Sequence, residues 1–69
     1  MDADQGFMVD RLRMELGRDS GWLVREVVFQ GGESRLMVTS PEEAVHSFTW
    51  EELYASKDPT QLVQARFSE

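Results

Sequence analysis

Cysteine is absent from this chain of 69 residues, and His46 is its only histidine. The first absence excludes disulfide bonds and thiolate zinc sites, and the second excludes a multi-histidine metal site. A domain of this size buries only roughly 60% of the surface of its unfolded chain, so its stability margin is narrow. Small domains usually add a disulfide, a metal or a partner subunit. We therefore expect no metal and no cofactor, and favour a homo-oligomer, with a dimer as the preferred form.

Long hydrophobic runs are also missing. The longest are three residues, such as Phe7-Met8-Val9, whereas a membrane-spanning helix needs about 20. The acidic start Met1-Asp2-Ala3-Asp4 lacks the positive charge and apolar core of a secretory signal. We therefore expect a cytoplasmic protein without a membrane partner, which agrees with the absence of cysteine.

Positive charge is scarce, because 7 basic residues stand against 13 acidic ones and the net charge is −6. An acidic chain repels phosphate, which disfavours nucleic acid as a partner. Five of the bases nevertheless fall in the first half of the chain: Arg11, Arg13, Arg18, Arg25 and Arg35. They either pair with neighbouring acids on a solvated surface, which we favour, or form a local basic patch.

No set of residues in the sequence indicates catalysis. His46 and Ser47 would point to opposite sides of a strand, so they make a poor nucleophile and base. The acidic pairs at 42–43 and 51–52 suit a turn and a helix start better than two carboxylates facing one site. Gly31-Gly32 lacks the framework of a phosphate-binding loop. We expect a protein that is not an enzyme and has no catalytic residues.

An amphipathic helix is predicted over roughly residues 5–16, with Asp4 as its N-cap and Gly17 as its stop. At 100° per residue, one stripe of this helix faces the core. It consists of Met8, Val9, Leu12 and Leu16.

A second side of the same helix carries Phe7 and Met14, together with Arg11 and Arg18. These apolar residues are either tolerated exposed side chains or a contact face for another copy of the chain, since Met, Phe and Arg suit interfaces. Because two tryptophans are many for so short a chain, one of them is expected to serve a partner. The candidate interface residues are Phe7, Met14, Arg11, Arg18 and Trp22.

A β-hairpin is predicted around Gly31-Gly32, because aromatic and β-branched residues dominate 22–30 and 33–39 follows as a second strand. Two glycines suit a two-residue turn with positive φ, which would place Gln30 opposite Glu33. In that register one face is the better core, made of Leu23, Val27, Phe29, Leu36 and Val38. The mixed face then holds Trp22, Val24, Val28 and Met37 with Glu26, Arg35 and Thr39, and Glu26 would lie close to Arg35.

The second half of the chain leaves two alternatives open. Residues 40–43 form either a turn, which we favour, or a helix start. Residues 44–50 alternate as a third strand, and Thr49-Trp50-Glu51-Glu52 has the capping-box pattern of a short helix. Residues 59–67 read as an edge strand or as a helix, and we favour the strand.

These elements predict a single α+β domain over residues 1–69, in which an N-terminal amphipathic helix precedes a small antiparallel β-meander of three to five strands. This element order resembles that of Sm-like and SH3-like small barrels. The resemblance implies a closed barrel, and it rests on element order alone.

Three functions fit the sequence. The first is a non-enzymatic, self-associating module that binds another protein through the second side of the helix or the mixed sheet face. The second is a nucleic-acid-binding small barrel that uses arginines and aromatic residues. The third is an acidic inhibitor that mimics nucleic acid, based on the acids at 42–43, 51–52 and 58.

Overall fold

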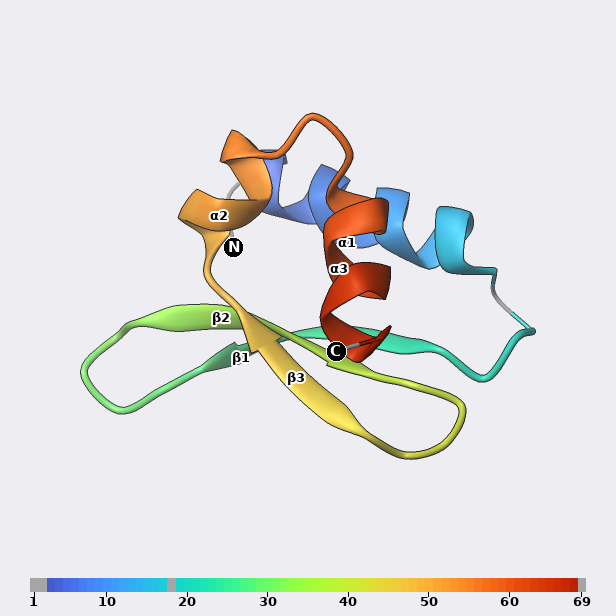
Figure 1. Ribbon diagram of the computed structural model, residues 1–69. Coiled ribbons are helices and arrows are strands. Elements are labelled where there is room, and N and C mark those ends of the chain that lie inside the picture. Colours follow the sequence, from blue (N-terminus) through green and yellow to red (C-terminus); the bar gives the residue numbers. More distant parts are fainter. Residues whose placement is uncertain (1–2, 18, 69) are drawn as a thin grey trace.

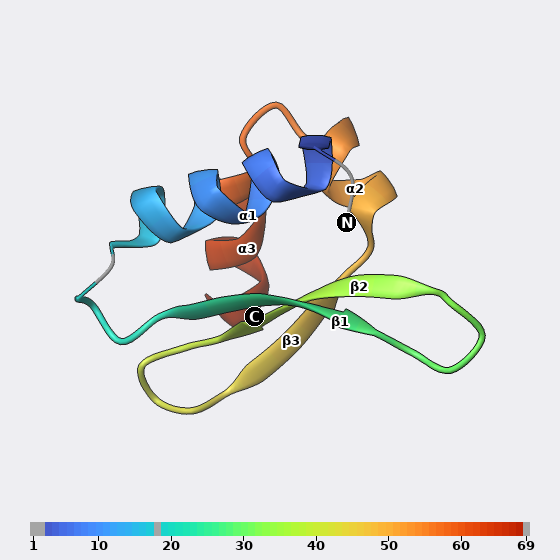
Figure 2. The ribbon, with the colours of Figure 1, turned by 180° about the vertical axis from the view of Figure 1, so that it is seen from behind.

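The computed structural model describes residues 3–17 and 19–68. Its elements in chain order are α1 (Ala3–Leu16), β1 (Leu23–Val28), β2 (Ser34–Thr39), β3 (Val45–Phe48), α2 (Trp50–Ala55) and α3 (Pro59–Ser68). The strands form one antiparallel sheet in the order β1-β2-β3, and all three helices lie on one side of it (Figure 1). Figure 2 shows the same arrangement from behind, and in both views no helix or strand of the described residues lies below the sheet.

The α+β class and the helix followed by a β-meander are therefore confirmed. The sheet has three strands and stays open, so the closed barrel implied by the resemblance to Sm-like and SH3-like proteins is not formed. The chain leaves β3 directly into α2 and α3, and these helices cover the sheet where a barrel would close it with further strands.

Helix α1 follows the predicted amphipathic pattern. Val9, Leu12 and Leu16 are buried and Met8 packs against them. Gly17 ends the helix with a φ of 93°, and its N–H donates to the carbonyl of Arg13, as a left-handed glycine does at a helix end. Asp4 was expected as the N-cap, but α1 already includes Ala3. Asp4 therefore lies inside the first turn, where its charge still favours the helix dipole.

The hairpin between β1 and β2 has a longer loop than predicted. The N–H of Phe29 donates to the carbonyl of Glu33 at 2.7 Å, and the N–H of Gly32 donates to the carbonyl of Phe29 at 3.0 Å. Phe29 and Glu33 thus close a loop of three residues, in which Gly31 and Gly32 have φ values of 97° and 90°. The predicted pairing of Gln30 with Glu33 is wrong by one residue.

This single residue exchanges the two faces of β1, because a register slip moves every side chain to the other side of a sheet. Leu36 and Val38 are buried under the helices, as predicted. The β1 residue buried beside them is Val24, whereas Leu23 and Val27, which were predicted there, lie on the opposite face. Phe29 was predicted on the core face and lies on the face away from the helices, and Val28 is displaced in the opposite sense. Glu26 pairs with Leu36 and so lies on the helix side. Arg35 pairs with Val27 on the face away from the helices, so Glu26 and Arg35 do not share a face.

The turn between β2 and β3 is confirmed. The N–H of Glu43 donates to the carbonyl of Ser40 at 2.9 Å, and Ser40 and Ala44 close the loop with a hydrogen bond of 2.8 Å. Glu43 has a φ of 70° and is the one residue other than glycine with positive φ in the described part of the chain. This is a three-residue hairpin loop whose last position is left-handed. The third strand follows, with His46 and Phe48 on the helix side.

Helix α2 begins with the predicted capping box. The hydroxyl of Thr49 accepts from the N–H of Glu52 at 3.2 Å, and the N–H of Thr49 donates to a carboxylate oxygen of Glu52 at 3.0 Å. At its start, the indole nitrogen of the buried Trp50 donates to the hydroxyl of Ser34 at 2.8 Å. This bond attaches α2 to β2.

Residues 59–67 are helical, so the predicted edge strand is wrong. The carboxylate of Asp58 accepts from the N–H of Gln61 at 3.1 Å, and its carbonyl accepts from the N–H of Leu62 at 3.0 Å. Asp58 is therefore the N-cap and Pro59 the first helical residue, which is the position that proline favours. Thr60 and Val63 are buried against the rest of the core, at the spacing of a helix face.

One hydrophobic core lies between the sheet and the helix layer. It joins side chains from every helix and every strand, and its fully buried large members include Phe48, Leu12, Leu36, Leu53, Val38 and Val63.

Candidate functional site

Two groups of residues considered from the sequence, a metal cluster and the His46–Ser47 pair, are not formed in the described residues. No group of three or more His, Asp and Glu side chains in residues 3–17 and 19–68 could hold a metal ion. His46 lies on the helix side of β3, where its ring and the Phe67 ring form a T-shaped contact with centroids 4.5 Å apart. Ser47 lies on the opposite face. The two do not form a pair, as expected from their alternation along a strand.

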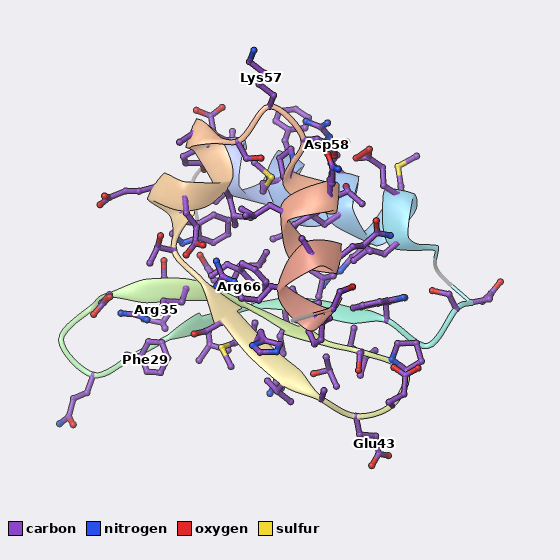
Figure 3. All side chains as sticks on the ribbon, in the orientation of Figure 1. Phe29, Arg35, Glu43, Lys57, Asp58 and Arg66 are labelled. Carbon is purple, nitrogen blue, oxygen red and sulfur yellow. The ribbon has the colours of Figure 1, made fainter. Side chains whose placement is uncertain are left out.

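Glu52 is a carboxyl with a clear electrostatic perturbation, and its role is structural. The hydrogen bond from the backbone of Thr49 lowers the pKa of Glu52 below its usual 4.5, and the ion pair with Arg66 lowers it further against an opposing effect of burial. Arg66 in turn lies over the ring of Phe48, 4.7 Å from its centroid. Figure 3 shows Arg66 reaching from α3 into the space beneath the helix layer. This cluster attaches α2 and α3 to the sheet.

The arginines of the described residues are spread over the molecule and do not form one basic patch. The guanidinium of Arg13 donates to the carbonyl of Val24 at 3.0 and 2.8 Å and so joins α1 to β1. Arg11 pairs with Glu15 on α1 at 2.8 Å. The acids are equally dispersed, and Figure 3 shows Glu43 and Asp58 at opposite ends of the molecule.

The predicted interface residues fall into separate places. Phe7 and Met14 are 73% and 67% exposed on the side of α1 that faces away from the core. Arg11 lies between them along the helix. Trp22 lies elsewhere and is half-buried, and its ring forms a T-shaped contact with the Phe67 ring, with centroids 5.1 Å apart. Arg18 lies outside the described residues. Phe7, Arg11 and Met14 therefore form one surface, which we call the α1 outer face.

A shallow depression lies beside Phe7 on this surface. It is lined by Asp4, Phe7, Met8 and Arg11 from α1 and by Tyr54 from α2. Tyr54 is 48% exposed and stacks on the ring of Trp50. Sequence spacing predicted the Phe7–Met14 pair, but it contained no signal for Tyr54, because only the tertiary fold brings α2 next to the start of α1.

A second exposed surface is the side of the sheet that faces away from the helices. We call it the open face, and it carries the apolar side chains of Leu23, Val27, Met37 and Val45 with the bases Arg25 and Arg35. Leu23 and Val45 are 64% and 53% exposed and lie on either side of Thr39 in the register. The sequence predicted a mixed face, but it placed the wrong set of alternate β1 residues on that face. Leu23, Arg25 and Val27 were therefore not recognised as part of it.

Comparison with known proteins finds no matching family model, no similar curated protein and no similar solved structure. Within residues 3–17 and 19–68, no helix has the length and apolar character that a membrane crossing requires. The α1 outer face and the open face are the two exposed apolar surfaces described for this protein.

Proposed function

We propose that this protein is a non-enzymatic interaction module of the cytoplasm that self-associates as a dimer through the α1 outer face. The observation behind this proposal is the exposure of Phe7 and Met14 on one side of α1. They are seven positions apart, so they lie in line two helical turns apart. Large exposed apolar side chains gathered on one surface are typical of interaction sites.

Two such helices fit each other when they run antiparallel about a two-fold axis. Phe7 of one copy then lies opposite Met14 of the other, and the same contact repeats on the far side of the axis, as an isologous interface requires. Methionine sulfur makes favourable contacts with aromatic rings. The depression beside Phe7, with Tyr54 at its wall, provides a place for the incoming methionine.

Local charge neutrality on α1 supports a contact between identical chains. A net charge of −6 opposes association of two copies over long range. On α1, however, Arg11 pairs with Glu15 at 2.8 Å and Arg13 approaches Asp10 at 4.0 Å. The one base of the α1 outer face is thus neutralised by Glu15, and two copies can meet there with less repulsion than elsewhere on the surface.

The size of the surface sets the expected strength. Stable interfaces bury about 800 Å² on each partner, and one helix of 14 residues with one tyrosine offers less. We expect a dimer that dissociates on dilution, with higher salt strengthening it because salt screens the net negative charge.

Light scattering coupled to size-exclusion chromatography over a range of protein concentrations tests the proposal. The wild-type chain should move from monomer to dimer mass as concentration rises. The double variant Phe7→Gln, Met14→Gln keeps good helix formers at both positions and should remain a monomer with an unchanged circular dichroism spectrum. Leu23→Gln, Val45→Thr changes the open face instead and serves as the matched control, which should still dimerise. A wild-type monomer at all concentrations, or a double variant that still dimerises, overturns the proposal.

A further inference from the structure

We propose that the open face of the sheet is a docking surface for an acidic amphipathic helix of a partner protein. This inference rests on the proposed role as an interaction module, but it concerns a different face from the α1 dimer. The surface is the lower side of the sheet in Figure 2, on which none of the described helices lies.

Apolar side chains occupy the open face across all three strands. Leu23 on β1 and Val45 on β3 are more than half exposed. Met37 on β2 lies between Arg25 and Ser47 in the register. Phe29, 43% exposed, extends the apolar surface just beyond the end of β1. Burying such side chains would stabilise a complex by roughly 25 cal/mol for each Å² of apolar surface removed from water.

The charge of the open face is opposite to that of the whole chain. The strands place Arg25 and Arg35 on this face and no acidic residue. Arg35 pairs with Glu33 at the hairpin, at 3.2 Å, next to Phe29 (Figure 3). No ion pair engages Arg25 within residues 3–17 and 19–68. Carboxylates of a partner would therefore find one unpaired base and one partly neutralised base beside apolar side chains.

This charge argues against a second copy as the occupant. Packing two open faces together would bring Arg25 and Arg35 of both copies into one interface that excludes water. Like charges placed together at an interface cost several kcal/mol. The residual charge therefore favours a partner with acidic side chains.

The kinds of apolar side chain favour a protein over a nucleic acid. Single-stranded nucleic acids bind to sheet faces by stacking bases on aromatic rings. Among the described residues, the apolar side chains on the open face are aliphatic residues and methionine, and the ring of Phe29 lies at its end. Leucine and valine pack well against the aliphatic side chains of a protein partner.

The dimensions of the surface favour a helix. Neighbouring strands lie about 4.8 Å apart, so three strands form a shallow platform about 10 Å across. A helix with its side chains has a diameter of about 10–12 Å. The apolar residues are spread over the three strands and not along one edge, which suits a helix lying across the face with anchors at i, i+3 or i+4, and i+7. Such a complex would place helices on both sides of the sheet.

A pair of synthetic peptides provides the probe. One is an amphipathic helix with leucines at the anchor positions and glutamates at the flanking positions, and the other replaces each glutamate with lysine. Binding is followed by methyl resonances of Leu23, Met37 and Val45 in an isotope-labelled chain and by fluorescence anisotropy of labelled peptide. We expect the acidic peptide to shift these resonances and the basic peptide to leave them unchanged.

Two variants test the role of the arginines. Arg25→Glu, Arg35→Glu should weaken binding of the acidic peptide by about tenfold or more, since two attractions become repulsions. Arg25→Gln, Arg35→Gln removes the charges without adding repulsion and should lose a smaller factor, which keeps the test valid if the first variant does not fold. Phe7→Gln, Met14→Gln is the matched control and should bind the peptide as the wild type does.

Several results would overturn the inference. These are equal binding of the acidic and basic peptides, full binding by the glutamate double variant, or no response of the three methyl groups to the acidic peptide. A larger response to an oligothymidylate would replace the protein partner with a nucleic acid. Dimer formation through Leu23 and Val45 would replace it with a second copy. Dimerisation through α1 is measured by mass, and peptide docking is measured by methyl resonances and anisotropy. Failure of one proposal can therefore be distinguished from failure of the other.

Discussion

The two faces of one three-stranded sheet differ in nearly every property. The covered face holds Val24, Leu36, Val38 and Phe48, all buried beneath the helices. The open face is built from the alternate residues of the same strands and carries arginines among half-exposed aliphatic side chains. Both faces are rich in apolar residues, so hydrophobicity alone does not distinguish them. What distinguishes them is the pair of arginines on the open face and the helix layer that covers the other face.

Leucine to alanine on each face should give the largest contrast. Leu36→Ala on the covered face removes a fully buried side chain and should lower the free energy of unfolding by about 3 kcal/mol. Leu23→Ala on the open face removes an exposed one and should cost less than about 1 kcal/mol. Urea unfolding of both variants at low protein concentration provides the comparison. Equal losses would contradict the difference and would mean that the open face is itself covered in solution.

Valine to threonine makes a smaller and cleaner contrast, because the two residues share their shape and β-branching. Val38→Thr places a hydroxyl in the core and should cost about 1–3 kcal/mol unless it finds a hydrogen-bond partner. Val45→Thr at the edge of the open face should change stability by less than about 0.5 kcal/mol. Thermal unfolding distinguishes them, and a large loss for the threonine at position 45 would show that this valine is packed.

Acidification should weaken the attachment of α2 and α3 at the rim of the covered face. The pKa of Glu52 is lowered in the folded chain, so its contribution to stability is present above the usual pKa and is lost as pH falls through the lowered value. Because Glu52 is about one-third exposed, we expect Glu52→Gln to cost about 1 kcal/mol or less at pH 7.

The matched control for this prediction is Glu51→Gln, which changes the exposed neighbouring acid and removes no ion pair among the described residues. It should therefore cost less than Glu52→Gln at pH 7, and the difference between Glu52→Gln and wild type should vanish at pH values below the lowered pKa of Glu52. Urea unfolding at a series of pH values measures both. A constant difference at all pH values would exclude the proposed electrostatic origin.

The smallest predicted effect on the free energy of unfolding concerns the backbone of the turn between β2 and β3, which belongs to neither face. Glu43 has a φ of 70°, where glycine is unstrained and other residues are not. Glu43→Gly should raise the free energy of unfolding by about 0.5 kcal/mol after allowing for the extra flexibility of the unfolded chain. Glu42→Gly, at the preceding position without positive φ, should instead lower it. Chemical unfolding checks both signs, and a destabilised Glu43→Gly would refute the account of this turn.

The sequence predicted the local features that depend on nearby residues. The amphipathic stripe of α1, the capping box at Thr49, the turn at Ser40 and the third strand are all present as expected. Each of these is determined within a few residues by periodicity, by a side chain that binds a nearby amide, or by proline geometry.

The errors arose where a local pattern has two physical solutions. Gly31 and Gly32 can close a two-residue or a three-residue loop. The two-residue loop was predicted and the three-residue loop is formed, so every β1 side chain lies on the face opposite to the predicted one. In α3, Val63 and Phe67 are spaced for one helix face but also fit strand alternation with Ala65. The Asp58 cap, together with packing against α1 and α2, favours the helix. The error in the hairpin loop placed the wrong β1 residues on the open face, whereas the error in α3 did not affect this face.

The α1 outer face was easier to predict, because it depends on helical periodicity alone. Phe7 and Met14 are exposed on one side of α1, although the interface itself stays a prediction. The neighbouring Tyr54 depends on how α2 folds back over α1, and no spacing in the sequence contains that contact.

The two tryptophans are placed so that their fluorescence can report on two separate parts of the structure as the chain unfolds. Trp50 is buried and hydrogen-bonded between α2 and β2, and Trp22 is half-buried between the start of β1 and α3. Their indole emissions therefore report on different junctions of the same layer. In a chain from which Trp22 has been replaced by phenylalanine, the remaining emission would follow the attachment of α2. In the reciprocal Trp50→Phe chain, it would follow the attachment of α3. Superimposable unfolding curves from the two chains would mean that the helix layer leaves the sheet as one cooperative unit.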